Sequence, residues 1–178
     1  MKSIKEMTME ELAAYVCNRL EEKGIETVLS GGCCVQIYSQ GRYTSDDIDL
    51  IDRFNGGHRR IKEVMFEMGF IEHNRYFIHD ETEYFIEFPR GPLGVGDAPV
   101  YEIETLEKET GILKLLTPTD CIKDRLAAYY HWDDPQSLEQ AVWVAERNSV
   151  DLTSIEEWSQ KEGMMDKFAI FQKRINDN

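Results

Sequence analysis

The chain has 178 residues, 42% of them apolar, and 34 acidic residues stand against 20 basic ones, which gives a formal net charge of −14. This length and apolar content predict one domain, or one domain with an appendage, around its own core. The acidic balance argues against an extended nucleic-acid surface, because such surfaces use Lys and Arg to neutralise phosphates. No apolar run approaches the roughly 20 residues that span a bilayer, and no apolar stretch near the start is typical of a signal peptide. We therefore expect a cytoplasmic protein with no membrane partner, and the spacing of its four cysteines fits reduced thiols.

The first third of the chain predicts alternating helices and strands. Thr8 and Glu11 form a capping-box pattern, and apolar residues then recur at helical spacing until Gly24 ends the helix. The expected elements after it are a strand, a short helix and a second strand, over residues 25–29, 33–38 and 47–51.

Short strands dominate the middle of the chain, and helices dominate its end. We expect a helix over residues 60–68, strands over 70–71, 76–79, 84–88, 100–103 and 112–115, and a loop over 91–99. Thr117 caps the next helix with Pro118 at its first position, and Asp134 and Asp151 mark the starts of two more. A last helix covers residues 164–175. The pattern predicts a mixed α/β core over residues 1–116 and a helical segment over 117–178.

Two carboxylates stand two residues apart in the expected strand over 47–51. On a strand, Asp47 and Asp49 point to one face while Ile48 points to the other. Paired carboxylates repel each other unless a cation lies between them, and Mg²⁺ prefers such oxygen ligands together with substrate phosphates. Gly31 and Gly32 precede a helix, whose N-terminal N–H groups are suited to phosphate. Together these features indicate metal-assisted chemistry on a nucleoside triphosphate.

The stretch from Gly31 to Leu50 resembles the signature of the polymerase-β-like nucleotidyltransferase superfamily. The residues that carry the resemblance are Gly31-Gly32-Cys33-Cys34-Val35 and Arg42-Tyr43-Thr44-Ser45-Asp46-Asp47-Ile48-Asp49-Leu50. This spelling is most similar to a small bacterial branch of AbiEii-toxin-like and uncharacterised proteins. The resemblance covers roughly residues 25–130, with Leu116–Asp120 similar to the start of a C-terminal helical part. It implies an α/β (α+β) fold, a mixed β-sheet flanked by helices with a C-terminal helical segment.

The resemblance also implies a catalytic set of three carboxylates. Asp47 and Asp49 would hold two Mg²⁺ ions, and Glu87 would complete the ion on the acceptor side. Glu87 matches best because it interrupts an apolar run, but Glu83 and Glu81 remain alternatives for the third ligand.

The nucleotide, ATP or another nucleoside triphosphate, is expected at Gly31, Gly32 and Cys33. Relatives commonly have Ser or Thr in place of Cys33, which is a weak donor and is also explained as a buried filler. Arg42 and Thr44 stand just before the acidic strand and are candidates for phosphate contact, although Arg42 would also pair with a carboxylate of its loop. Asp47 and Asp49 have an alternative of their own, as charged residues on an edge strand.

Two classes of function follow. The leading hypothesis is a Mg²⁺-dependent nucleotidyltransferase that moves a nucleoside monophosphate group to a hydroxyl of an unknown small molecule, protein or RNA. The alternative is a catalytically degenerate domain of the same fold that binds a nucleotide or a protein. A toxin role with an antitoxin partner is a third expectation, and it comes from the resemblance alone.

Overall fold

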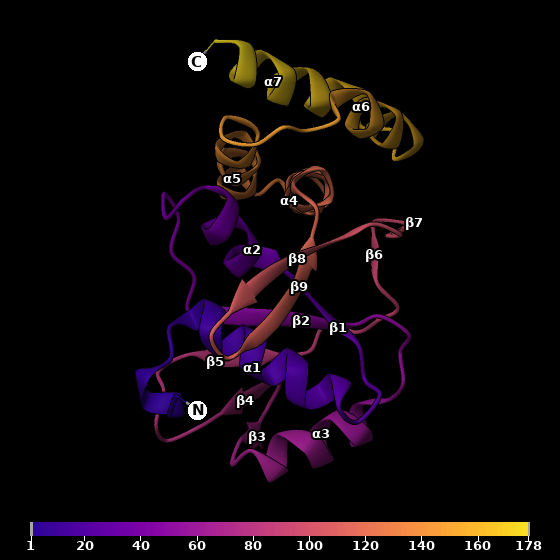
Figure 1. Cartoon of the computed structure of the whole chain (residues 1–178). Helices are drawn as coiled ribbons and strands as arrows, with labels where there is room; N and C mark the ends of the chain where they lie inside the picture. Colours follow the sequence, from indigo (N-terminus) through magenta and orange to yellow (C-terminus); the bar gives the residue numbers. More distant parts are fainter. Residues whose placement is uncertain (1, 178) are drawn as a thin grey trace.

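A mixed seven-stranded sheet forms the centre of the molecule (Figure 1). The computed structural model describes residues 2–177. Residues 1 and 178, the outer ends of the expected segments 1–116 and 117–178, lie outside the described part. The strand order is β3-β4-β5-β2-β1-β9-β8. The strands are β1 Thr27–Ser30, β2 Asp47–Asp52, β3 Ile71–His73, β4 Tyr76–Ile78, β5 Phe85–Glu87, β8 Ile103–Lys108 and β9 Gly111–Leu116. Two further strands, β6 Gly94–Val95 and β7 Ala98–Pro99, pair with each other.

Helices flank this sheet and gather beyond one end of it. In Figure 1, α4 to α7 are grouped at the end of the molecule that holds the C-terminus, whereas α1 and α3 lie beside the strands at the other end. The helices are α1 Met9–Glu21, α2 Gly31–Tyr38, α3 His58–Glu67, α4 Pro118–Trp132, α5 Pro135–Ala145, α6 Leu152–Lys161 and α7 Met165–Asn176, with a short 3₁₀ turn at Ile4–Glu6. The expected fold class, a mixed sheet with flanking helices and a C-terminal helical segment, is confirmed. The sheet ends at Leu116 and α4 begins at Pro118, while the division into two domains at that point stays a prediction.

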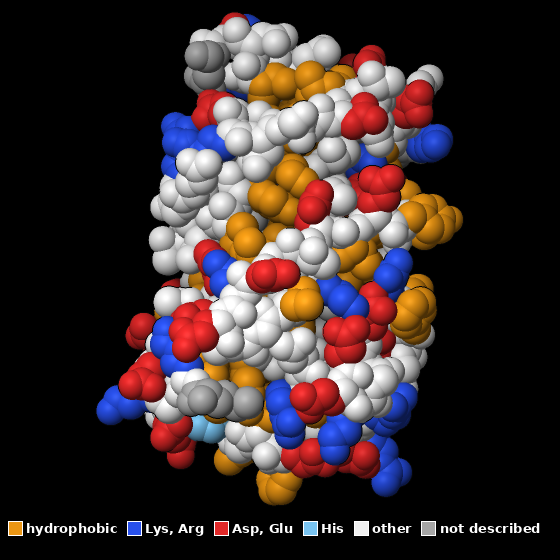
Figure 2. Space-filling model, viewed as in Figure 1, with side chains coloured by type: hydrophobic (Ala, Val, Ile, Leu, Met, Phe, Trp, Pro, Cys, Tyr) orange, Lys and Arg blue, Asp and Glu red, His pale blue; other side chains and the backbone are white. Residues whose placement is uncertain are grey.

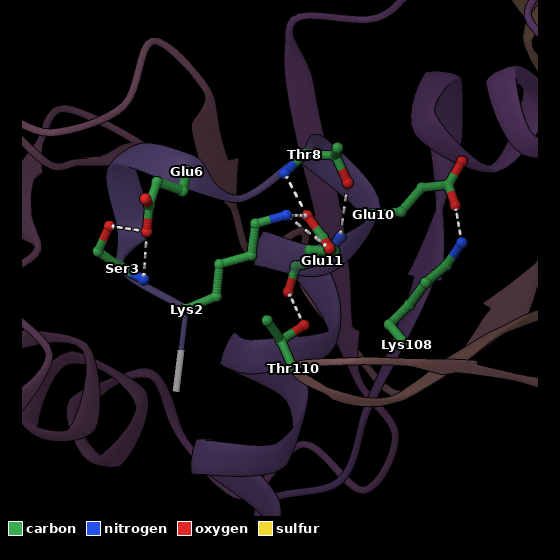
Figure 3. Close-up of polar contacts among 8 residues, drawn as sticks. All are labelled: Lys2, Ser3, Glu6, Thr8, Glu10, Glu11, Lys108 and Thr110. Carbon is green, nitrogen blue, oxygen red and sulfur yellow. Dashed lines mark hydrogen bonds and ion pairs between the residues drawn. The ribbon is translucent and has the colours of Figure 1, made fainter.

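Local capping signals were reliable guides to the helix starts. Figure 3 shows the box of α1, in which the Thr8 N–H donates to Glu11 Oε2 over 2.7 Å and the Glu11 N–H donates to Thr8 Oγ1. Thr110 Oγ1 donates to the Glu11 carbonyl over 2.6 Å and ties α1 to the β8–β9 hairpin. The expected caps at Thr117, Asp134 and Asp151 are confirmed as well.

Three expected boundaries were wrong. The helix after the Gly-Gly pair begins at Gly31 rather than at residue 33, so both glycines belong to its first turn. Residues 91–99 are not all loop, because they contain the β6–β7 pair. The strand expected over 100–103 is displaced to Ile103–Lys108, where antiparallel pairing with β9 decides its length. Its Glu and Lys residues are tolerated because β8 lies at the edge of the sheet.

Charges of both signs lie on the face of the molecule that Figure 2 shows. On the face in Figure 2, Lys and Arg side chains are interspersed with Asp and Glu. No helix within residues 2–177 is long and apolar enough to cross a membrane.

Candidate active site

The register of the sheet brings five strands together at one row of side chains. Asp49 pairs with Ser30 of β1 on one side and with Glu87 of β5 on the other. Glu87 in turn pairs with Tyr76, and Tyr76 with His73. Directly paired residues point to the same face, so these side chains form one row, which we call the site row: His73, Tyr76, Glu87, Asp49 and Ser30.

Asp47 lies on the face of the site row, as the two-residue spacing predicts. Along β2, Asp47 and Asp49 are half-buried while Ile48 and Leu50 are fully buried in the core. The edge-strand alternative is wrong, because β2 lies inside the sheet between β5 and β1. Two carboxylates on an interior strand repel each other at close range, which is costly without a compensating cation.

Glu87 is the acid of its segment that the fold places beside this pair. β5 runs parallel to β2, and this pairing sets Glu87 opposite Asp49. Glu81 and Glu83 precede β5 and are exposed, so the register favours Glu87 among the three candidates.

Gly31 lets α2 begin against the Asp49 carboxylate. A Cβ built on Gly31 would lie 1.9 Å from Asp49 Oδ2, and the φ of Gly31 is +63°, a conformation that side chains rarely adopt. A Cβ on Gly32 would lie 2.7 Å from Ser45 Oγ. The structure therefore explains both glycines by the room that they leave for neighbouring side chains, and their contact with phosphate stays a prediction.

Burial and repulsion raise the pKa of Asp49 to about 6. Removal from solvent is the largest cause, the Glu87 carboxylate adds to it, and Arg125 opposes it. A half-buried acid next to a second acid is the electrostatic pattern of many functional sites.

Two arginines that the motif does not include balance these acids. Arg75, in the β3–β4 turn, places its Nε 3.4 Å from Glu87 Oε2. Arg125 of α4 donates from Nη2 to Asp124 Oδ2 over 2.5 Å and from Nη1 to Gln140 Oε1 over 3.4 Å. Burial opposes the charge of Arg125, but Asp124 and Asp49 hold its pKa above the usual value.

Sequence reasoning missed Arg125 and Asp124 as parts of the site. The available signal was a charged pair between Ile122 and Leu126, two residues that are fully buried. Arg125 and Asp124 are partly buried and pair with each other, and their charges also act on Asp49 of β2, far away in the sequence.

The remaining predicted nucleotide contacts lie in different surroundings. Arg42 donates to Glu146 Oε2 over 2.5 Å and places its guanidinium 5.4 Å from the centre of the Trp143 ring, so its carboxylate partner belongs to the end of α5 and not to its own loop. Thr44 is exposed in the loop before β2. Cys33 is fully buried, which raises the pKa of its thiol, so only its backbone is left to contact a phosphate.

Asp47, Asp49 and Glu87 have the donor chemistry for Mg²⁺ but are not prearranged around a single point. Among residues 2–177, no three His, Cys, Asp or Glu side chains are placed to hold one metal ion. Carboxylate oxygens on one face suit Mg²⁺, and a cation would offset both the burial and the Glu87 repulsion that raise the pKa of Asp49. Glu87 Oε2 also forms an ion pair with Arg75, which competes with a metal ion for this carboxylate.

We expect Asp49→Asn to stabilise the metal-free protein at neutral pH. In the folded state the Asp49 carboxyl has a pKa of about 6 instead of 3.8, so its ionised form lowers the free energy of unfolding. The cost is absent below about pH 4, grows as the pH rises through 6, and reaches on the order of 1–3 kcal/mol at pH 7.5. Urea unfolding of both proteins with a chelator at pH 4 and pH 7.5 measures it. A variant with the same stability difference at both pH values would contradict this electrostatic cost.

Comparisons with known proteins add two structures. Neither a family model nor a curated protein matches the sequence. A solution structure of the antibiotic-resistance factor ANT(2'')-Ia is similar at 16% identity and a TM-score of 0.46, over 92% of this chain and 90% of that one. A crystal structure of ANT(2'')-Ia in complex with adenylyl-2''-tobramycin is similar at 17% identity and a TM-score of 0.48, over 90% of this chain and 94% of that one.

Proposed function

We propose that this protein is a Mg²⁺-dependent nucleotidyltransferase that moves a nucleoside monophosphate group from a nucleoside triphosphate to a hydroxyl. One observation carries the proposal: Asp49, on an interior strand, lies directly opposite Glu87, with Asp47 on the same face. Such a row of acids costs folding stability and is explained by a cation that it holds during function.

The acids divide the work between the nucleotide and the acceptor. Asp47 and Asp49 would hold Mg²⁺ with the triphosphate, and Glu87 would serve the acceptor side. When bound, Mg²⁺ supplies the positive charge that stabilises the leaving pyrophosphate and lowers the pKa of the attacking hydroxyl. The positive charge of Arg125 on α4 lowers the pKa of Asp49 and so favours its ionised form.

The nucleotide's phosphates approach the first turn of α2. There the backbone N–H groups of Gly31, Gly32 and Cys33 are the donors, because a helix N-terminus favours anions. Arg42 and Thr44, in the loop before β2, are the candidates for side-chain contact with the phosphates. To make this contact, Arg42 would leave its present partner Glu146. The toxin role and the antitoxin partner implied by the resemblance stay predictions.

A degenerate, non-catalytic nucleotide-binding or protein-binding module is the second candidate. Two observations favour it. The thiol of Cys33, at the position where the family that the chain resembles commonly has Ser or Thr, is buried, and Arg75 forms an ion pair with Glu87. Nucleotide binding without pyrophosphate release in the presence of any hydroxyl acceptor would support this reading.

We expect calorimetry to detect Mg²⁺-dependent binding of at least one of the four nucleoside triphosphates to the wild-type protein. The Asp47→Ala/Asp49→Ala variant should lose the Mg²⁺-dependent part, since it lacks the carboxylates that would share the ion with the triphosphate. Failure of all four nucleotides to bind the wild type would contradict the proposal, and so would unchanged binding by a folded double variant.

A further inference from the structure

A hollow of about 310 Å³ lies on the sheet beside the acids. Its walls are Asp47, His73, Tyr76, Ile78 and Phe85. His73 and Tyr76 belong to the site row, and Phe85 pairs with Asp47 across β2 and β5. The hollow is therefore a continuation of the proposed active site towards the β3 edge of the sheet.

Three of the five wall residues carry aromatic rings, and the rings of Tyr76 and Phe85 contact each other. The centres of the Tyr76 and Phe85 rings are 5.8 Å apart at 47°. Phe85 is 42% exposed, although a large apolar ring usually gains by burial. An exposed aromatic surface next to a catalytic centre is suited to stacking with a flat ring.

A cation stands beside this surface. The Arg75 guanidinium lies 4.8 Å from the centre of the Tyr76 ring and donates from Nη2 to Tyr76 Oη over 2.5 Å. The Arg75 side chain is 67% exposed, so little packing holds it in place. A metal ion that bound Glu87 would compete with Arg75 for this carboxylate. Arg75 would then be available to an anionic group, for which guanidinium has suitable donors.

We propose that this hollow binds the acceptor through a nucleobase stacked on Tyr76 and Phe85, with a phosphate of the same acceptor on Arg75. The inference rests on the proposed function. Aromatic walls and a neighbouring cation together fit a ring that carries phosphate, which is the chemistry of a nucleotide or of an RNA end. The net charge of −14 favours the nucleotide, because a longer RNA meets more repulsion.

The position in the site row separates acceptor from donor. Ser30 and the first turn of α2 follow Asp49 at one end of the row, where the triphosphate is proposed to lie. Tyr76 stands on the other side of Asp49, beyond Glu87. An acceptor in the hollow thus reaches Asp49 from the side opposite to the pyrophosphate, as in-line displacement requires.

The step that this arrangement serves is balanced without a further reagent. A hydroxyl oxygen of the acceptor forms a bond to the α-phosphorus of the triphosphate. The bond from that phosphorus to the oxygen bridging to the β-phosphate breaks, and pyrophosphate leaves with the electron pair. The hydroxyl proton passes to a carboxylate of the site row and then to solvent.

The test is acceptor binding with the donor site filled. Calorimetry is run with Mg²⁺ and ATP whose α,β-bridging oxygen is replaced by methylene, so that no transfer occurs. The four nucleoside 5′-monophosphates and a single-stranded RNA octamer with a free 3′ end are then titrated separately. We expect binding to the wild type and to Tyr76→Phe, and a loss of roughly 10-fold or more in Tyr76→Ala, because one stacked base is lost.

Tyr101→Ala is the matched control. Tyr101 is 78% exposed and precedes β8, at the opposite edge of the sheet from β4. The Tyr101→Ala variant should bind the nucleoside monophosphates and the RNA octamer as the wild type does. Binding of the monophosphate alone or of the RNA alone supports the inference and identifies the source of the base.

Three outcomes would overturn it. In the first, the ATP analogue binds but neither a monophosphate nor the RNA does. This result refutes acceptor binding in the hollow and leaves the proposed function standing. In the second, Tyr76→Ala and Tyr101→Ala give equal affinities. In the third, the ATP analogue itself fails to bind, which refutes the proposed function and this inference with it. Melting temperatures and binding of the ATP analogue confirm that each variant is folded.

Discussion

Asp49→Asn is expected to reduce nucleotide transfer by roughly 10³-fold or more. The substitution keeps the shape of the side chain but removes the charge that would bind Mg²⁺, and a catalytic metal is worth several kcal/mol, with each 1.36 kcal/mol equal to tenfold in rate. Asp49 stands between Ser30 and Glu87, and Glu87 is already assigned to the acceptor side. Transfer of label from α-³²P nucleoside triphosphates to a pool of hydroxyl acceptors measures the effect.

Asp46→Asn is the matched control for this experiment. Asp46 immediately precedes β2 and is exposed, so its charge is solvated and its removal should change transfer less than threefold. Equal loss in Asp46→Asn and Asp49→Asn would mean that net negative charge, and not the site row, controls activity. Unchanged transfer in Asp49→Asn would contradict the assigned role of Asp49 directly.

Gly31→Ala is expected to destabilise the fold and to abolish Mg²⁺-dependent nucleotide binding. The added Cβ would lie 1.9 Å from Asp49 Oδ2, so the carboxylate or the start of α2 has to move. The positive φ of Gly31 adds roughly 1–2 kcal/mol of backbone strain for any residue with a Cβ. Urea unfolding and calorimetry with the nucleotide that the wild type binds measure the two effects.

Gly163→Ala separates the clash from the strain. Gly163 has a similar φ of +72°, but no heavy atom lies within 4 Å of its built Cβ. This variant should show the backbone cost alone and bind nucleotide normally. If Gly31→Ala is no more destabilised than Gly163→Ala and also keeps its nucleotide binding, the close contact with Asp49 is not a constraint.

Elements whose signals are local were predictable. The Thr8 box, the Thr117 and Asp134 caps and the alternating strand of Asp47 and Asp49 each depend on residues within a few positions of one another. Hydrogen bonds at a helix start and the two-residue alternation of a strand hold in almost any tertiary setting. The positions of these elements therefore agree with the structure to within a few residues.

Elements whose extent depends on a partner strand were predicted less well. β8 continues to Lys108 through residues of low strand propensity because β9 pairs with it, and β6 and β7 support each other within the expected loop. Strand propensity depends strongly on cross-strand neighbours, and these are unknown until the sheet is assembled.

By itself, the sequence determined the alternation of helices and strands, the shared face of Asp47 and Asp49 and the Gly31-Gly32 pair near a helix start, because these follow from short-range spacing and steric limits. Only the tertiary structure decided that Glu87, and not Glu81 or Glu83, stands opposite Asp49, since parallel pairing of β2 with β5 sets that register. The tertiary structure also places Arg75 and Tyr76 beside Glu87 and lets the charge of Arg125 act on Asp49. It pairs Arg42 with Glu146. Those contacts join segments far apart in the chain, and long-range packing and charge pairing, which no local pattern records, select them.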